Sequence, residues 1–302
     1  MESHSSDQSA ERHPAPIFIL GMRPRTGTHF LANLLCQHPD CVKSPIAEDS
    51  FLLNANLLAR YVTRTNAQWT TVNGTPLPGY DEILRRCIGD GLLSFLRQIQ
   101  LRRQEERASK FGKQIVVSDV QRRLVTKTPH FDNLELFSQF LPRADLLLLV
   151  RDGRAVVESN VRSFASDPED EMRAWAAAAD QLAQFEAETR EGAPRYLIVR
   201  FEDLHSRTEA EMRRILIFLG LSTEDYNFEA ALNLPVVGSS TFKRPPGKVS
   251  WLPVRKTPDF DPLARASEWT RATHERFQSL AGKQLVRLGY SQTLENNRAE
   301  DL

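Results

Sequence analysis

The residues best suited to chemistry lie in the segment GMRPRTGTHF, at positions 21–30. It combines a cation, Arg25, with two hydroxyl side chains, Thr26 and Thr28, and with Gly27 between them. Because an apolar run precedes it and a helical pattern follows, the segment is the turn from a strand into a helix. Free backbone N–H groups and the positive end of a helix bind anions there, most often phosphate. The segment therefore predicts a phosphate site, with a purely structural turn as the alternative.

A second unit of the same kind follows at positions 150–164, VRDGRAVVESNVRSF. Arg151 stands at the end of an apolar run, and Ser159 follows eight residues later in the next helical pattern. Open α/β sheets bind their ligands at the carboxyl ends of the strands. If the two helices lie side by side, Arg151 and Ser159 hold a second phosphate. The alternative is a salt-bridged helix face that combines Arg151 with three charged neighbours, Asp152, Arg154 and Glu158.

The elements that must position these residues alternate between apolar runs and helical patterns. Runs at 15–21, 144–150 and 195–200 predict strands, the first of them buried on both faces. Helical patterns follow at 30–35, before His38-Pro39, at about 154–163, and at 212–219, before Gly220. This alternation predicts an α/β fold, in which a parallel sheet like that of P-loop proteins is flanked by helices.

One domain is expected to span residues 14–292. Within it, the segment 51–113 differs, because it carries polar turns at NGTPLPGYD and a helical stretch at about 81–108. This segment is predicted to be a mainly helical insertion over one edge of the sheet. Residues 1–13 are polar and predict a disordered tail, and residues 293–302 predict a frayed end.

Composition excludes several classes of protein. The 302 residues carry 39 basic and 39 acidic side chains, so their formal charge of zero argues against a general nucleic-acid binder. No apolar run approaches the roughly 20 residues that cross a bilayer, and residues 1–16 lack the apolar stretch of a signal peptide. Cys36, Cys41 and Cys87 form no CxxC pair. A cytoplasmic protein without a membrane span or a metal site is expected.

Taken together, the two phosphate-site units resemble the sulfotransferases that use 3′-phosphoadenosine 5′-phosphosulfate. The resemblance to tyrosylprotein sulfotransferases and their bacterial relatives is close. RTGTH is similar to the family segment that holds the 5′-phosphosulfate, and RDGRAVVES is similar to the segment whose Arg and Ser hold the 3′-phosphate. The resemblance implies the sulfotransferase fold, with 51–113 on the acceptor side. It also implies seven donor-binding residues here: Arg25, Thr26, Gly27, Thr28, His29, Arg151 and Ser159.

Two further segments carry the same resemblance. LVTKTPH resembles the stretch whose lysine, here Lys127, reaches the sulfuryl group. SSTFKRPPGKVSW resembles the late loop that closes over the nucleotide. That loop implies Ser239 or Ser240, together with Arg244 and Lys248, as further donor-binding residues. His29 and Phe201 depart from the family, in which a second Thr and a Tyr are common at these positions.

An acceptor hydroxyl also needs a base. Relatives with HPD after the first helix place a catalytic Glu nearby, which implies Glu48 in this chain. His130, in LVTKTPH, is the alternative, because an imidazole of ordinary pKa suits proton transfer near neutral pH. A packing or helix-start role for His130 is the structural interpretation.

The resemblance implies an enzyme that moves the sulfuryl group of this donor to a hydroxyl of a sugar, a peptide tyrosine, a lipid or a small molecule. By analogy with phosphoryl transfer, the hydroxyl arrives in line and nearby cations stabilise the leaving oxygen. Lys127 and Arg25 are the cations expected to do so. The transferred group carries less negative charge than a phosphoryl group, so the mechanism requires no metal. The sequence also shows no HExxH motif or Cys/His cluster.

Two other functions stay open. The first is an ATP-dependent P-loop kinase acting with magnesium, although five residues separate Gly21 from Gly27 and no lysine follows, as the Walker pattern requires. The second is a non-catalytic nucleotide-binding protein of the same fold. A homodimer is a possibility only because dimers are the commonest soluble oligomers.

Overall fold

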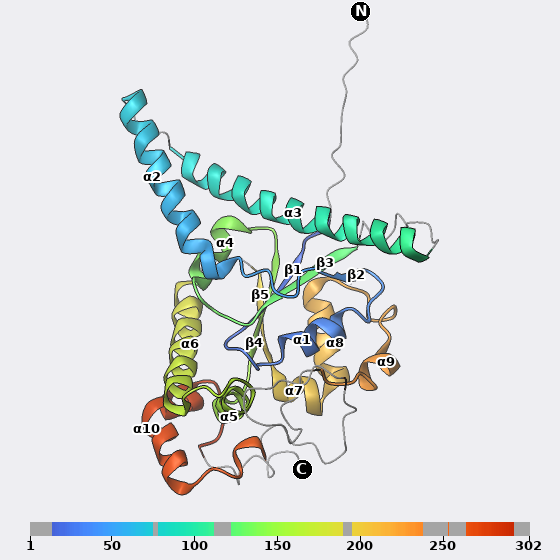
Figure 1. Ribbon diagram of the computed structural model, residues 1–302, viewed down its shortest axis with the longest axis vertical. Coiled ribbons are helices and arrows are strands. Elements are labelled where there is room, and N and C mark those ends of the chain that lie inside the picture. The colour runs from blue at the N-terminus through green and yellow to red at the C-terminus, as the bar shows by residue number, and fades with distance from the viewer. Residues whose placement is uncertain are drawn as a thin grey trace, which may run out of the picture.

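A five-stranded parallel sheet forms the centre of the protein (Figure 1). The computed structural model describes residues 14–74, 78–111, 122–189, 195–237, 253 and 264–292. The strand order is β2-β3-β1-β4-β5. The strands are β1 (Ile17–Gly21), β2 (Cys41–Lys43), β3 (Arg123–Thr128), β4 (Asp145–Val150) and β5 (Tyr196–Arg200). Strand β1 therefore lies between β3 and β4, with Ile17 opposite both Val125 and Asp145.

Apolar side chains cover both faces of the two central strands. All residues of β1 and β4 are buried. Phe18 and Leu148 belong to the hydrophobic cluster on one face, whereas Ile19 and Leu147 belong to the cluster on the other. This alternation follows from the two-residue repeat of a strand, and a strand covered on both faces needs apolar residues throughout.

Two layers of helices supply the rest of these clusters. One cluster takes residues from α4 (Phe137–Phe140), α5 (Gly153–Phe164), α6 (Pro168–Glu188) and α10 (Arg271–Arg287). The other takes residues from α1 (Thr28–Leu35), α7 (Phe201–Ser206), α8 (Thr208–Leu219) and α9 (Phe228–Leu232). The molecule is thus a sheet between two helical layers (Figure 1). No helix in the described part of the chain is both long enough and apolar enough to cross a membrane.

The segment 51–111 forms two long helices that project from the body (Figure 1). They are α2 (Ala55–Asn73) and α3 (Tyr80–Phe111). In α3, Gly89 lies against the backbone of Phe140, and Arg97 donates to the carbonyl of Arg122 over 2.7 Å. Because Phe140 and Arg122 precede β4 and β3, α3 lies at the amino ends of these strands.

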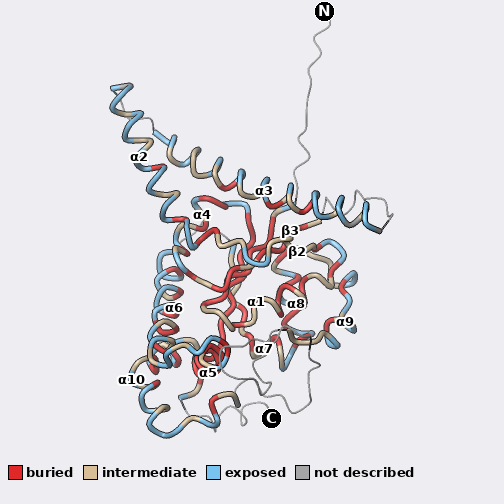
Figure 2. The backbone as a smooth tube through the Cα atoms, in the orientation of Figure 1, coloured by how far each residue is buried: buried red, intermediate tan, exposed pale blue. Residues whose placement is uncertain are grey.

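Most of the large hydrophobic residues exposed in the described chain lie on or just before this helical pair. Eight of the twelve large hydrophobic residues exposed in the described chain lie between residues 53 and 95. Figure 2 shows most of both helices as exposed, in contrast to the buried sheet. Apolar residues gathered in one exposed region are typical of an interaction surface. The homodimer nevertheless stays a prediction.

The structure confirms the α/β fold and most of the elements expected around the site. The strands expected at 15–21, 144–150 and 195–200 correspond to β1, β4 and β5, and Gly220 ends α8 with a φ of 66°. The helix expected from about 81 to 108 is longer, and α2 was not expected. The predicted tails, residues 1–13 and 293–302, lie outside the described residues.

Candidate active site

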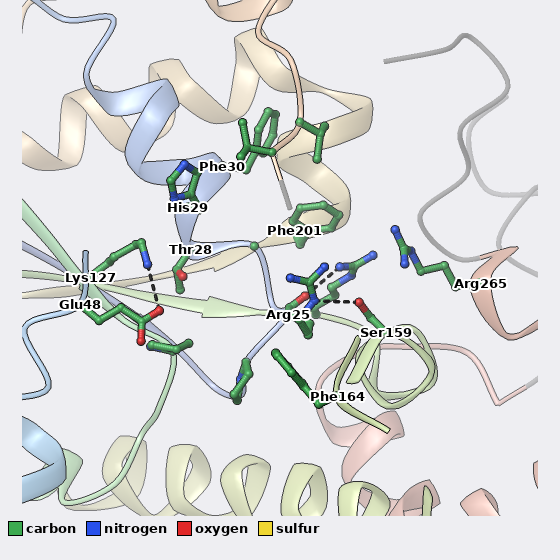
Figure 3. A pocket seen from close by; sticks show the side chains of 16 residues that line it. Arg25, Thr28, His29, Phe30, Glu48, Lys127, Ser159, Phe164, Phe201 and Arg265 are labelled. Carbon is green, nitrogen blue, oxygen red and sulfur yellow. Dashed lines mark hydrogen bonds and ion pairs between the residues drawn. The ribbon is translucent and has the colours of Figure 1, made fainter. Parts of the chain in front are cut away.

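A pocket opens at the carboxyl ends of β1, β3 and β4 (Figure 3). The connection that leaves β1 leads to β2 on one side of the sheet, whereas the connection that leaves β4 leads to β5 on the other. Adjacent strands whose connections diverge in this way leave a crevice, which is where open α/β sheets bind ligands. The empty space of the pocket, which is open to solvent, is about 800 Å³.

The turn between β1 and α1 has a backbone that few residues tolerate. Gly27 caps α1 with a φ of 111°, in the left-handed region that favours glycine. A Cβ on Gly27 would also lie 2.4 Å from the ring of Phe201. Gly27, Thr28 and His29 line the pocket, and the first N–H groups of any helix lack a carbonyl partner within that helix. The residues that carry these N–H groups therefore lie at the pocket, and the anion site that the sequence suggests stays a prediction.

Thr26, unlike its neighbours Gly27 and Thr28, does not line the pocket. Its side chain is fully buried, and its hydroxyl donates to the carbonyl of Arg23 over 2.5 Å while accepting from the N–H of Arg23. Thr26 is not among the lining residues. Its hydroxyl therefore holds the turn together, whereas Thr28 lines the pocket.

Arg25 joins the two units that the sequence suggested separately. Its Nε donates to the Ser159 hydroxyl over 3.1 Å, and its carbonyl accepts from Arg151 Nη1 over 2.9 Å. Asn160 of α5 donates to the carbonyl of Pro24 over 3.1 Å and so fixes the same turn. Burial, and then the nearby charge of Arg151, lower the pKa of Arg25 to about 10. The positively charged side chains of Arg25 and Arg151 therefore lie close together where water is partly excluded.

Arg151 is nearly inaccessible to solvent, with 4% of its surface exposed. Its guanidinium lies over the ring of Phe201, 4.1 Å from the centroid. Within the described part of the chain, its Nε and Nη2 are buried and have no hydrogen-bond partner. Buried donors without partners cost free energy, so these two N–H groups have unused capacity for an acceptor.

Glu202 is a partly buried acid whose charge acts on Arg151. It accepts from the backbone N–H of Asp152 over 3.1 Å and from the Tyr290 hydroxyl over 2.9 Å. Burial raises the pKa of Glu202, and the charge of Arg151 opposes that rise. Glu202 is not among the residues that line the pocket, and its charge balances part of the charge of Arg151.

The salt-bridged helix face, which was the alternative for Arg151, does not form. Asp152 instead pairs with Arg154 over 2.6 Å, and both side chains are buried. Glu158 accepts from the indole N–H of Trp269 over 2.7 Å and pairs with Arg162.

Sequence reasoning did not identify Arg265, which lies in the short helix η4 (Ala264–Ala266) and lines the pocket. Burial, then Arg151 and Arg25, lower the pKa of Arg265 to about 9. Three arginines therefore converge at one end of the pocket. No local sequence pattern indicates Arg265 as a site residue, because η4 packs on α5, and the two elements are separated by about one hundred residues of sequence.

Lys127 and Glu48 occupy the other end of the pocket (Figure 3). Their Nζ and Oε1 atoms are 3.1 Å apart. Glu48 reaches this place because its segment runs beside β3: Ser44 donates to the carbonyl of Val125, and Asp49 donates to that of Lys127. The pocket therefore has an arginine-rich end and an end with a paired lysine and carboxylate.

The two histidines differ in position. His29 lines the pocket, and burial followed by the charges of Lys43 and Lys127 lowers its pKa to about 4. His130 is not among the lining residues, and its Nδ1 lies 3.3 Å from Asp132. Burial lowers the pKa of His130 as well. Burial therefore favours the neutral form of both imidazoles.

A sequence model of the sulfotransferase family matches residues 16–225, well over half of the chain. The chain belongs to the sulfotransferase family. Protein-tyrosine sulfotransferase A of Caenorhabditis elegans is 27% identical over 235 residues, which are 74% of this sulfotransferase and 55% of that relative. This sulfotransferase thus spans about half the length of the relative.

Two solved structures are similar to this sulfotransferase over most of its length. The sulfotransferase domain from the curacin biosynthetic pathway matches with a TM-score of 0.50 and 21% identity, over 93% of this chain and 99% of that domain. The sulfotransferase domain of the Synechococcus PCC 7002 olefin synthase matches with a TM-score of 0.48 and 21% identity, over 91% and 96%. The curacin domain shows that the central sheet with flanking helices is a sulfotransferase fold.

Some predicted site residues of this sulfotransferase cannot be placed. The late loop with Ser239, Ser240, Arg244 and Lys248 lies outside the described residues. None of the described lining residues comes from 51–111, so the acceptor-side role of that segment stays a prediction. Among the described residues, no group of three or more His, Cys, Asp or Glu side chains is arranged to hold a metal ion.

Proposed function

We propose that this sulfotransferase moves the sulfuryl group of 3′-phosphoadenosine 5′-phosphosulfate to an acceptor hydroxyl. The observation that carries the proposal is Arg151, whose Nε and Nη2 are buried beside the pocket without an acceptor among the described residues. Ser159 and Arg25 lie next to it, and two parallel N–H groups of a guanidinium match a phosphate. These residues fit the 3′-phosphate that distinguishes this donor from ADP and ATP.

The other end of the pocket suits the reacting part of the donor. The N–H groups at the start of α1, with Thr28, would hold the 5′-phosphosulfate, and Lys127 lies across the pocket from them. When bound, the donor supplies a sulfuryl group already activated by its anhydride bond to phosphate. Lys127 would stabilise the negative charge that grows on the departing phosphate oxygen.

Glu48 is the residue we propose as the base. It lines the pocket and its carboxylate is held beside Lys127, whereas His130 lies outside the lining and is engaged with Asp132. The acceptor oxygen forms its bond to sulfur as the bond from sulfur to the phosphate oxygen breaks. The proton of the acceptor hydroxyl passes to Glu48 Oε, and adenosine 3′,5′-bisphosphate leaves.

Transfer from ³⁵S-labelled donor to an extract of small hydroxylated molecules and peptides tests this function. We expect labelled product with the parent protein, none with Glu48→Gln, and nearly normal product with His130→Gln. Adenosine 3′,5′-bisphosphate should bind equally well to Glu48→Gln and the parent, because Glu48 acts on the acceptor. Loss of transfer in His130→Gln with retention in Glu48→Gln would exchange the roles of the two residues.

A further inference from the structure

A second, smaller pocket adjoins the first. It lies between the first turns of α1, the segment after β2, and β3, and its empty space is about 360 Å³. His29 and Lys127 line both pockets. The two pockets therefore share part of one wall, in which Lys127 pairs with Glu48 (Figure 3).

The wall of the second pocket is mostly apolar. Ala32, Ile46, Ala47 and Val125 provide this surface. Apolar walls with a few polar groups are typical of small-molecule sites, because burial of apolar surface provides affinity and the polar groups set orientation. The pocket thus suits a body of the size of one aromatic ring.

One lysine lines the second pocket and not the first. Lys43 lines it, and within the described residues its ammonium donates to the amide oxygen of Asn33, which is neutral. Lys127, by contrast, is paired with the carboxylate of Glu48. Burial, and in part the charge of Lys127, lower the pKa of Lys43. An anion beside Lys43 would offset both the lost hydration of its ammonium and the repulsion from Lys127.

Backbone register places the segments that carry Lys43 and Glu48 along the same strand. Lys43 pairs with Val125 of β3, while Asp49, directly after Glu48, donates to the carbonyl of Lys127. These β3 positions are two residues apart, which is about 6–7 Å along a strand. Lys43 and Glu48 therefore belong to neighbouring parts of one wall.

We propose that the second pocket is the acceptor subsite, and that it takes a hydroxyl-bearing molecule whose short apolar body carries an anionic group beside Lys43. The proposal rests on the function proposed above. The apolar body lies against Ala32, Ile46 and Val125, and the hydroxyl passes His29 to reach Glu48. The anion gives the site a preference for acidic acceptors over neutral ones of the same shape.

Two probes of equal shape test the proposal: 4-hydroxybenzoate and its neutral counterpart 4-hydroxybenzamide. Their affinities are measured by ligand-observed NMR on protein saturated with adenosine 3′,5′-bisphosphate. We expect the benzoate to bind about five- to tenfold more tightly than the amide. Lys43→Gln should abolish this preference. Lys283→Gln, which removes an exposed lysine of α10, should retain it.

Each outcome decides one question. Equal affinities in the parent, no binding of either probe, or a preference that survives in Lys43→Gln would overturn the acceptor subsite. If the protein does not bind the bisphosphate at all, the proposed function fails first. If the bisphosphate binds and the probes behave otherwise than expected, only the acceptor subsite is rejected.

Discussion

Replacing Arg151 by glutamine separates recognition of the 3′-phosphate from binding of nucleotides in general. In the parent protein, Nε and Nη2 of Arg151 are buried donors without a hydrogen-bond partner among the described residues. A hydrogen bond to a charged group contributes about 1.5–3 kcal/mol. Loss of two such bonds, offset in part by the glutamine amide, weakens binding of adenosine 3′,5′-bisphosphate by about 3–4 kcal/mol, or roughly 10²–10³-fold. ADP has no 3′-phosphate, so its affinity should change much less.

The variant should still fold. Without Arg151, the pKa of the Glu202 carboxyl rises further, which favours the neutral acid over an unpaired charge. Thermal unfolding followed by circular dichroism checks this point before binding is measured.

Isothermal titration with the bisphosphate and with ADP gives the affinity ratio for parent and variant. Arg173→Gln is the matched control, because Arg173 lies on the exposed face of α6 and pairs only with acids of its own helix among the described residues. The reasoning is refuted if Arg151→Gln weakens both nucleotides by the same factor, or if it weakens neither.

Three further predictions follow from the same pocket. Gly27→Ala should lower the melting temperature and abolish nucleotide binding, because a Cβ there is strained by the φ of 111° and meets Phe201 at 2.4 Å; normal titration curves would contradict this. Arg265→Gln should raise the melting temperature of the ligand-free protein by relieving repulsion from Arg25 and Arg151, yet weaken the bisphosphate about tenfold; a lower melting temperature with unchanged affinity would reject the anion-binding role. The folded-state pKa of His29, about 4, lies below the ordinary 6.5, so its contribution to stability is present above pH 6.5 and is lost as pH falls toward 4. Denaturant titrations should therefore show a shallower pH dependence over this window for His29→Gln, and identical slopes would contradict the assignment.

The sequence predicted those elements whose patterns are local. Strands β1 and β4 are continuous apolar runs, and Gly220 ends α8 by a conformation that glycine adopts readily. Strand β3 was less visible, because it reads RLVTKT and mixes polar and apolar residues. Thr126 and Lys127 belong there for the site: Thr126 donates to Asp49, and Lys127 reaches Glu48.

Helix α2 was missed for a related reason. Its sequence contains several threonines and valines, which favour strands over helices, and much of its surface is exposed. The contacts of its N-terminal end with the body fix it instead: Leu52 and Ala55 are buried in the hydrophobic cluster that contains Phe140. A short sequence pattern cannot predict such long-range packing.

The site residues also fall into those that a local pattern predicts and those that depend on long-range packing. The turn around Gly27 and the pair Arg151 and Ser159 could be identified from spacing, because each belongs to one strand-to-helix unit. The contact of Arg25 with both partners depends on how the two units lie side by side in the sheet. Arg265 depends on where η4 packs, so no local pattern could indicate it.

The most direct test of the central claim is calorimetric titration of the parent protein with adenosine 3′,5′-bisphosphate, ADP and ATP, each with and without magnesium. A donor site of the proposed kind binds the bisphosphate tightly and independently of metal, with ADP much weaker. Equal binding of the bisphosphate and ADP, or a preference for ATP with magnesium, would contradict the role of Arg151 and favour a kinase.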